Sequence, residues 1–183
     1  MYNENVIVRK NFSIKAKTIM AFIAIVGAVA LPQIAHLGGA LIGVDNAIGT
    51  TLLPMHFAVI LVGLLAGGYA GALAGVMAPL VSHWLTAMPT AQMLPIMMVE
   101  LGAYGLVAGM LSKVEMNILL KVLLTQVMGR VLRAMFVFVL VHTMGNGIFT
   151  WASIWAPIQQ GLPGIALQLI TIPLLYKFFE KRI

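Results

Sequence analysis

The chain has 183 residues, of which 61% are hydrophobic and only 9% charged, with a formal net charge of +6 and no cysteine. A soluble domain carries about 25% charged residues, so this composition excludes an ordinary soluble protein and indicates an integral membrane protein with one helical domain over residues 1–183. The lack of cysteine excludes disulfides, iron–sulfur clusters and thiol-ligated zinc, and the positive charges lie between apolar segments rather than in a stripe that would bind nucleic acid.

Six apolar segments predict an all-α membrane protein with six transmembrane helices in one bundle. The polar and basic residues 1–14 come first and are expected to be cytoplasmic, with the first helix retained rather than cleaved. The predicted spans are residues 15–35, 54–70, 71–85, 94–111, 116–142 and 158–179. A glycine-rich turn without charge separates the second span from the third, so one merged helix is the main alternative there.

Basic residues set the expected orientation. In a six-span topology one side of the membrane collects Arg9, Lys10, Lys15, Lys17, Lys113, Lys121, Lys177, Lys181 and Arg182. The loops on the opposite side contain Asp45 and no lysine or arginine. By the positive-inside rule both termini are cytoplasmic, whereas a five-span topology would place the basic C-terminal segment outside.

Small residues recur every fourth position in several predicted spans. The second and third spans carry Gly63, Gly67, Gly71 and Gly75, the fourth carries Gly105 and Gly109, and the first carries Ala24 and Ala28. This spacing lets another helix backbone approach closely. The simpler interpretation is tight packing within the bundle, and the sharper one is that such a stripe contacts a partner protein.

Polar side chains within and beside the apolar segments indicate a binding site. Glu100, Arg133 and Gln168 are expected at similar depths, nearer the outer face than the inner one. The other candidate substrate-binding residues are His83, Trp84, Tyr104, Asn46 and Asn146. Together they predict an outward-facing pocket for a small polar molecule. The alternatives are a structural Glu100–Arg133 ion pair and, for Trp84, an aromatic belt at the membrane surface.

Other functional classes lack their sequence signals. The chain has no G-x-S-x-G or H-E-x-x-H motif, so an enzyme is not expected, and its four histidines are too scattered for a metal cluster. It has no G-x-x-x-x-G-K-[ST] motif, so ATP-driven transport needs other subunits. A pore stays an alternative, although no charged or carbonyl filter motif repeats in the sequence.

Several motifs together resemble one family. The run LLPMHFAVILVGLLAGGYAGALAGVMAPLVSHWLTAMP, followed by MMVELGAYGLVAGML and MGRVLRAM, is similar to the substrate-binding S component of energy-coupling factor (ECF) vitamin transporters. The resemblance covers nearly all of the chain from the first helix to the last. It implies a six-helix bundle in the bacterial plasma membrane, a vitamin pocket open to the outside and no cofactor.

The resemblance also implies partners. Members of the family work with a transmembrane coupling subunit and two cytoplasmic ATPase subunits, and an A-x-x-x-A motif on the first helix packs on the coupling subunit. Ala24 and Ala28 match that motif. A self-contained small membrane channel or a membrane scaffold is the alternative function.

The identity of the vitamin depends on how Glu100 and Arg133 are used. A carboxylate suits pyridoxine or hydroxymethylpyrimidine, which offer N–H or amino donors, whereas an arginine suits the carboxylate of pantothenate. If the two residues neutralise each other, a neutral hydroxylated ring fits better. Pyridoxine or hydroxymethylpyrimidine is therefore favoured, with pantothenate next.

Overall fold

The computed structural model describes residues 12–41, 43, 51–144 and 149–182. Within these ranges the chain is helical and has no strand. The seven helices are α1 (Ile14–Leu41), α3 (Pro54–Ala66), α4 (Gly68–Thr86), α5 (Leu94–Leu111), α6 (Ile118–Met144), α7 (Ala152–Gln160) and α8 (Leu162–Glu180). The predicted all-α class is confirmed for the described part of the chain.

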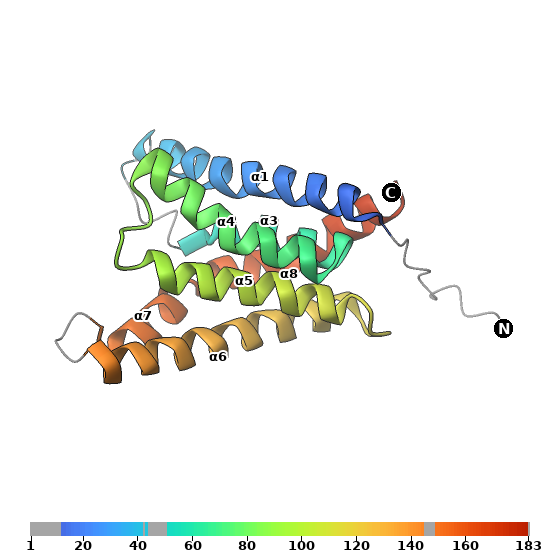
Figure 1. Cartoon of the computed structure of the whole chain (residues 1–183). Helices are drawn as coiled ribbons and strands as arrows, with labels where there is room; N and C mark the ends of the chain where they lie inside the picture. Colours follow the sequence, from blue (N-terminus) through green and yellow to red (C-terminus); the bar gives the residue numbers. More distant parts are fainter. Residues whose placement is uncertain (1–11, 42, 44–50, 145–148, 183) are drawn as a thin grey trace.

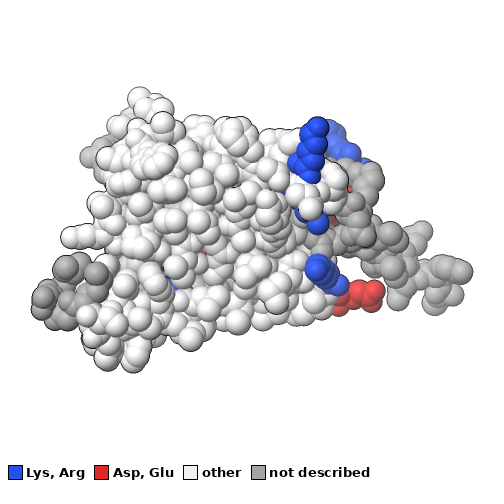
Figure 2. All heavy atoms as spheres, viewed as in Figure 1, with Lys and Arg blue, Asp and Glu red and all other residues white. Residues whose placement is uncertain are grey.

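The long helices lie side by side in one bundle, and successive ones run in opposite directions (Figure 1). The first described residues of α1 and the last ones of α8 lie at the same end of the bundle. Lysine and arginine side chains gather at this end, whereas the rest of the face seen in Figure 2 is almost free of charge. This end is called the basic end below.

Among the described residues, four helices are long and apolar enough to cross a membrane. They cover Ile14–Leu41, Leu94–Leu111, Ile118–Thr143 and Leu162–Glu180. These helices match the first, fourth, fifth and sixth predicted spans. The second predicted span corresponds to α3, which is apolar but only 13 residues long, and the third corresponds to α4. Six membrane crossings stay a prediction.

Three predicted boundaries were wrong. The first helix continues through Pro32 to Leu41 rather than ending near residue 35. The second and third spans are separate helices, as favoured, and the chain turns at Gly67, within the predicted glycine-rich turn, where a φ of 96° suits glycine. Helix α3 therefore ends at Ala66 rather than near residue 70. The last span is not one helix from residue 158, because Gly161 separates α7 from α8 and a proline follows in the first turn of α8.

The glycine stripes pack on one another inside the bundle. A Cβ atom added at Gly71 would lie 2.3 Å from the Gly105 carbonyl oxygen, and one at Gly75 would lie 2.2 Å from the Leu101 carbonyl oxygen. A Cβ atom at Gly109 would lie 1.9 Å from a backbone nitrogen of α4. Helices α4 and α5 are therefore in direct backbone contact, which confirms the simpler interpretation of the stripes.

Candidate functional site

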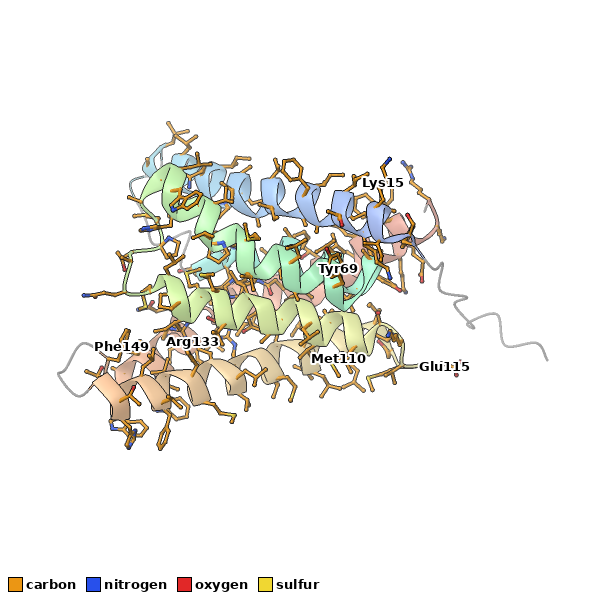
Figure 3. All side chains as sticks on the ribbon, in the orientation of Figure 1. Lys15, Tyr69, Met110, Glu115, Arg133 and Phe149 are labelled. Carbon is orange, nitrogen blue, oxygen red and sulfur yellow. The ribbon has the colours of Figure 1, made fainter. Side chains whose placement is uncertain are left out.

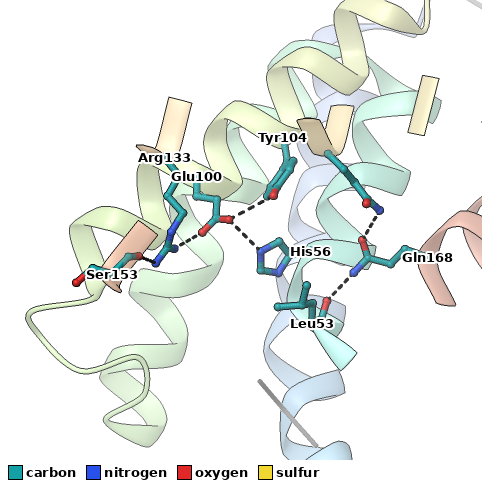
Figure 4. A network of polar contacts seen from close by, with 8 residues as sticks. Leu53, His56, Glu100, Tyr104, Arg133, Ser153 and Gln168 are labelled. Atoms are coloured by element: carbon teal, nitrogen blue, oxygen red, sulfur yellow. Dashed lines mark hydrogen bonds and ion pairs between the residues drawn. The ribbon is translucent and has the colours of Figure 1, made fainter. Parts of the chain in front are cut away.

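Glu100 lies in the middle of α5 with 3% of its surface exposed, and it forms an ion pair with Arg133. Its Oε2 accepts a hydrogen bond from Nη1 of Arg133 on α6 at 2.5 Å. The second terminal nitrogen of the guanidinium, Nη2, donates to the backbone carbonyl of Ser153 on α7 at 3.2 Å (Figure 4). The buried carboxylate is thus neutralised by a cation that is itself fixed by a third helix. Arg133 lies in the half of the bundle away from Lys15 and Glu115 (Figure 3).

The second oxygen of Glu100 faces two aromatic side chains. Oε1 accepts a hydrogen bond from the Tyr104 hydroxyl at 3.3 Å and lies 3.8 Å from Nε2 of His56 on α3. The two rings meet edge to face, with centroids 5.2 Å apart. Tyr104 follows Glu100 by one helical turn, so both point the same way. Gly129 on α6 makes room for the phenol, because a Cβ atom there would lie 2.3 Å from the tyrosine ring.

A pair of amides forms a second buried contact beside this network. Nε2 of Gln126 on α6 donates to Oε1 of Gln168 on α8 at 3.1 Å, and Nε2 of Gln168 donates to the Leu53 carbonyl at 3.1 Å. Leu53 immediately precedes α3, and its carbonyl also accepts the backbone N–H of His56. The amide pair and the ion pair therefore meet at the start of α3 (Figure 4).

Several buried atoms in this region do not use their hydrogen-bonding capacity. Within the described residues no partner is present for Nδ1 of His56, Oγ1 of Thr125, Oε1 of Gln126 or Nε of Arg133. Buried polar groups are nearly always hydrogen-bonded in folded proteins. A small molecule with both donors and acceptors is one way to satisfy them.

The structure brings together half of the predicted substrate-binding residues. Glu100, Arg133, Tyr104 and Gln168 are all buried around the same point. Asn46 and Asn146 lie outside the described residues.

His83 and Trp84 lie apart from this cluster. Nδ1 of His83 contacts the Pro89 carbonyl at 2.7 Å, at the end of α4. Trp84 is 78% exposed, which agrees with the aromatic-belt alternative. Their contribution to binding stays a prediction.

The predicted partner-binding alanines are used inside the chain. Ala28 is fully buried and Ala24 nearly so, and both belong to the main hydrophobic core. Helix α1 packs there on α3 and α4. Small side chains at these positions therefore already serve packing within this chain, and a contact with a coupling subunit stays a prediction.

Sequence reasoning missed His56, Gln126 and Ser153 as parts of the site. A signal existed for Gln126, because it precedes Arg130 by four residues and Arg133 by seven and so lies on the same helical face. His56 is one of the four histidines whose scattered positions did not indicate a metal cluster. Ser153 contributes its backbone carbonyl, and no sequence pattern predicts that contact.

Within the described ranges, no three histidine or acidic side chains lie close enough together to hold a metal ion. Comparison of the chain with protein-family models, with curated proteins and with solved structures found no match.

Proposed function

We propose that this chain is the S component of an ECF-type importer, which binds a small water-soluble vitamin or vitamin precursor from outside and delivers it inward. One observation carries the proposal: an apolar bundle buries an ion pair and an amide pair, and Gln126 and Arg133, one residue from each pair, keep a hydrogen-bonding atom without a partner among the described residues. Ionisable groups at membrane depth are expensive and mark functional sites more often than structural ones.

The arrangement of the charges supports a neutral guest. Glu100 and Arg133 contact each other directly, so the pair offers no net charge to a ligand. A hydroxylated ring with N–H or amino groups could hydrogen-bond to Glu100 and to the free Gln126 oxygen. Pyridoxine or hydroxymethylpyrimidine is therefore the favoured class of substrate, and pantothenate, which carries a carboxylate, is next.

The proposal includes six membrane spans with both termini in the cytoplasm, in a bacterial plasma membrane. The collection of lysines and arginines at one end of the bundle supports it by the positive-inside rule. The lack of native cysteine makes the topology easy to test with introduced ones. A cysteine at Ala91 should react with an impermeant thiol reagent added to intact cells, and a cysteine at Lys113 should not. The reverse pattern would contradict the orientation.

The energy for transport would come from partners, a transmembrane coupling subunit and two cytoplasmic ATPases, since the chain has no nucleotide-binding motif of its own. Co-purification with an ATPase pair supports this part of the proposal. A protein that conducts or assembles without ATPases would instead support the channel or scaffold alternative.

The substrate site is tested by measuring binding and melting on one sample. Mass spectrometry of small molecules released from the purified protein identifies the ligand. Glu100→Gln keeps the shape but removes the charge, so a ligand donor loses a charge-assisted bond worth roughly 1.5–3 kcal/mol. We expect affinity to fall on the order of tenfold to a hundredfold.

Glu115→Gln is the matched control, because Glu115 is exposed in the loop between α5 and α6. It should bind and melt like the unmodified protein. If Glu100→Gln melts at a lower temperature but binds with unchanged affinity, Glu100 is only structural and the proposed site is wrong.

A further inference from the structure

An open apolar groove of about 400 Å³ lies on the side of the bundle, and Gln168 of the buried amide pair is one of its lining residues. Its walls include Leu31 of α1 and Leu167, Thr171 and Leu174 of α8, and its floor includes Pro54 and Phe57 of α3. Helix α3 packs against both α1 and α8, whereas within the described residues these two helices hardly touch each other. The groove therefore exists because two candidate membrane helices are held apart by a third.

The polar groups that line the groove are already occupied. The Thr171 hydroxyl donates to the Leu167 carbonyl at 2.7 Å. The Gln168 amide is engaged by Gln126 and by the Leu53 carbonyl. The remaining lining side chains are hydrocarbon. Such a surface suits an alkyl chain better than a polar ligand.

The strip of α8 that lines the groove leads to a cation. Leu167, Thr171 and Leu174 are three or four residues apart, and the same spacing continues to Phe178 and Arg182. The guanidinium of Arg182 lies 4.1 Å from the centre of the Phe178 ring.

The face of α1 that lines the groove also continues along the helix to a basic residue. Counting back from Leu31 in steps of three and four residues leads through Gly27 and Met20 to Lys17. Lys17 lies in the first turn of α1 and Arg182 follows the last turn of α8, and these two helix ends lie together at the basic end (Figure 1). Lys15, Lys177 and Lys181 add three more cations there.

The length of this path matches one leaflet of a bilayer. Leu167 and the last residue of α8, Glu180, are separated by about 20 Å at 1.5 Å per residue, and Arg182 follows two residues later. Half of a bilayer, including the headgroup region, is roughly 20–22 Å thick. A lipid whose phosphate lies at the basic end would thus place the far part of its tail in the groove.

We propose that this groove binds one anionic glycerophospholipid of the leaflet at the basic end. Its acyl chain lies between α1 and α8 on α3, and its phosphate lies near Arg182 and Lys17. The anionic class follows from the charges, because clusters of basic residues next to membrane helices attract anionic headgroups. The inference rests on the membrane location of α1 and α8 and not on the proposed substrate.

The test compares two lipids with identical tails on the purified full chain in mild detergent. Phosphatidylglycerol and phosphatidylcholine are titrated separately, and native mass spectrometry counts the bound lipids. Thr171→Trp fills the groove, and Ile170→Trp is its control, because Ile170 is the next residue, is 64% exposed and does not line the groove. Arg182→Gln removes the proposed phosphate contact, and Lys113→Gln removes a cation from the loop between α5 and α6 as its control.

We expect one phosphatidylglycerol to bind more tightly than phosphatidylcholine. Thr171→Trp should abolish this binding and Arg182→Gln should weaken it about fivefold, while both controls bind normally.

Equal binding of the two lipids, equal loss in Arg182→Gln and Lys113→Gln, or normal binding by Thr171→Trp would each overturn the proposal. Vitamin binding by Thr171→Trp, measured in parallel, keeps failure of this site distinct from failure of the substrate site.

Discussion

Two faces of α5 contact their neighbours in different ways, one through backbone atoms at glycine and the other through polar side chains. Toward α4 the helix presents Gly105 and Gly109, whose backbone atoms touch the backbone of α4 directly. Toward α3 and α6 it presents Glu100 and Tyr104, which reach their neighbours through polar side chains. The first face has no space for an added methyl group, and the second is bordered by buried polar atoms that lack partners in the described part of the chain.

This difference indicates where the bundle is rigid and where it can change. Close backbone contact depends on one relative position of two helices. Polar side chains can exchange one partner for another at similar energy, provided that the new partner also satisfies them. We therefore expect ligand binding to rearrange the face of α5 toward α6, while α4 and α5 move together.

The largest effect is expected from removing the cation of the polar face. Arg133→Met leaves the buried Glu100 carboxylate without its charged partner, which should lower the free energy of unfolding by about 3–5 kcal/mol. The double variant Glu100→Gln with Arg133→Met should recover most of that loss, since neither partner then carries a charge. Thermal melting in detergent measures both. A single variant as stable as the unmodified protein would show that the ion pair does not support the fold.

A smaller loss is expected at the glycine face. Gly105→Ala places a Cβ atom 2.0 Å from the Gly71 carbonyl oxygen, so α4 and α5 must separate, at about 1–3 kcal/mol. Gly27→Ala is the control, because the nearest atom to its added Cβ is 3.9 Å away. The control should gain about 0.5–1 kcal/mol, since alanine favours a helix over glycine. Chemical unfolding measures the change in the free energy of unfolding of each variant. If both variants gained or both lost stability, the glycine face would not be special in lacking space for a methyl group.

A weaker effect is expected from a single neutral donor. Tyr104→Phe removes the hydroxyl that donates to Glu100 but keeps the ring against Gly129. The free energy of unfolding should fall by about 0.5–1.5 kcal/mol. Tyr69→Phe, at an exposed position on α4, should change the melting temperature very little. If both variants melt alike, the Tyr104 hydroxyl contributes nothing to the polar face.

The smallest effect on the unliganded fold is expected at a buried hydroxyl that has no partner in the described residues. Thr125→Val replaces the fully buried Oγ1 with a methyl group of similar size. We expect unchanged or slightly raised stability, by up to about 1 kcal/mol, because an unpaired polar atom is costly to bury. Affinity for the substrate should fall if the ligand uses this hydroxyl. Thr171→Val, which loses an existing bond to Leu167, serves as the comparison in calorimetry. A clear loss of stability in Thr125→Val would mean that the hydroxyl is already satisfied in the unliganded protein.

Sequence alone was sufficient for the features that depend on periodicity and composition. The fourth predicted span matches α5 residue for residue, because its apolar run is bounded by a proline at the start and by polar residues at the end. The meeting of Glu100 with Arg133 could also be anticipated, because two ionisable groups at similar depth in an apolar bundle have few other ways to be compensated.

Contacts between distant segments were decided by the tertiary structure. The break at Gly161 and the extension of α1 from residue 35 to Leu41 depend on how neighbouring helices pack, which local propensity does not encode.

The burial of Ala24 and Ala28 also depends on tertiary packing, as does the position of His56 beside Glu100. The pattern of small or polar residues determines which face of a helix can form close or polar contacts. Only the packing of the other helices determines what that face contacts, because several neighbours could satisfy the same spacing at similar energetic cost.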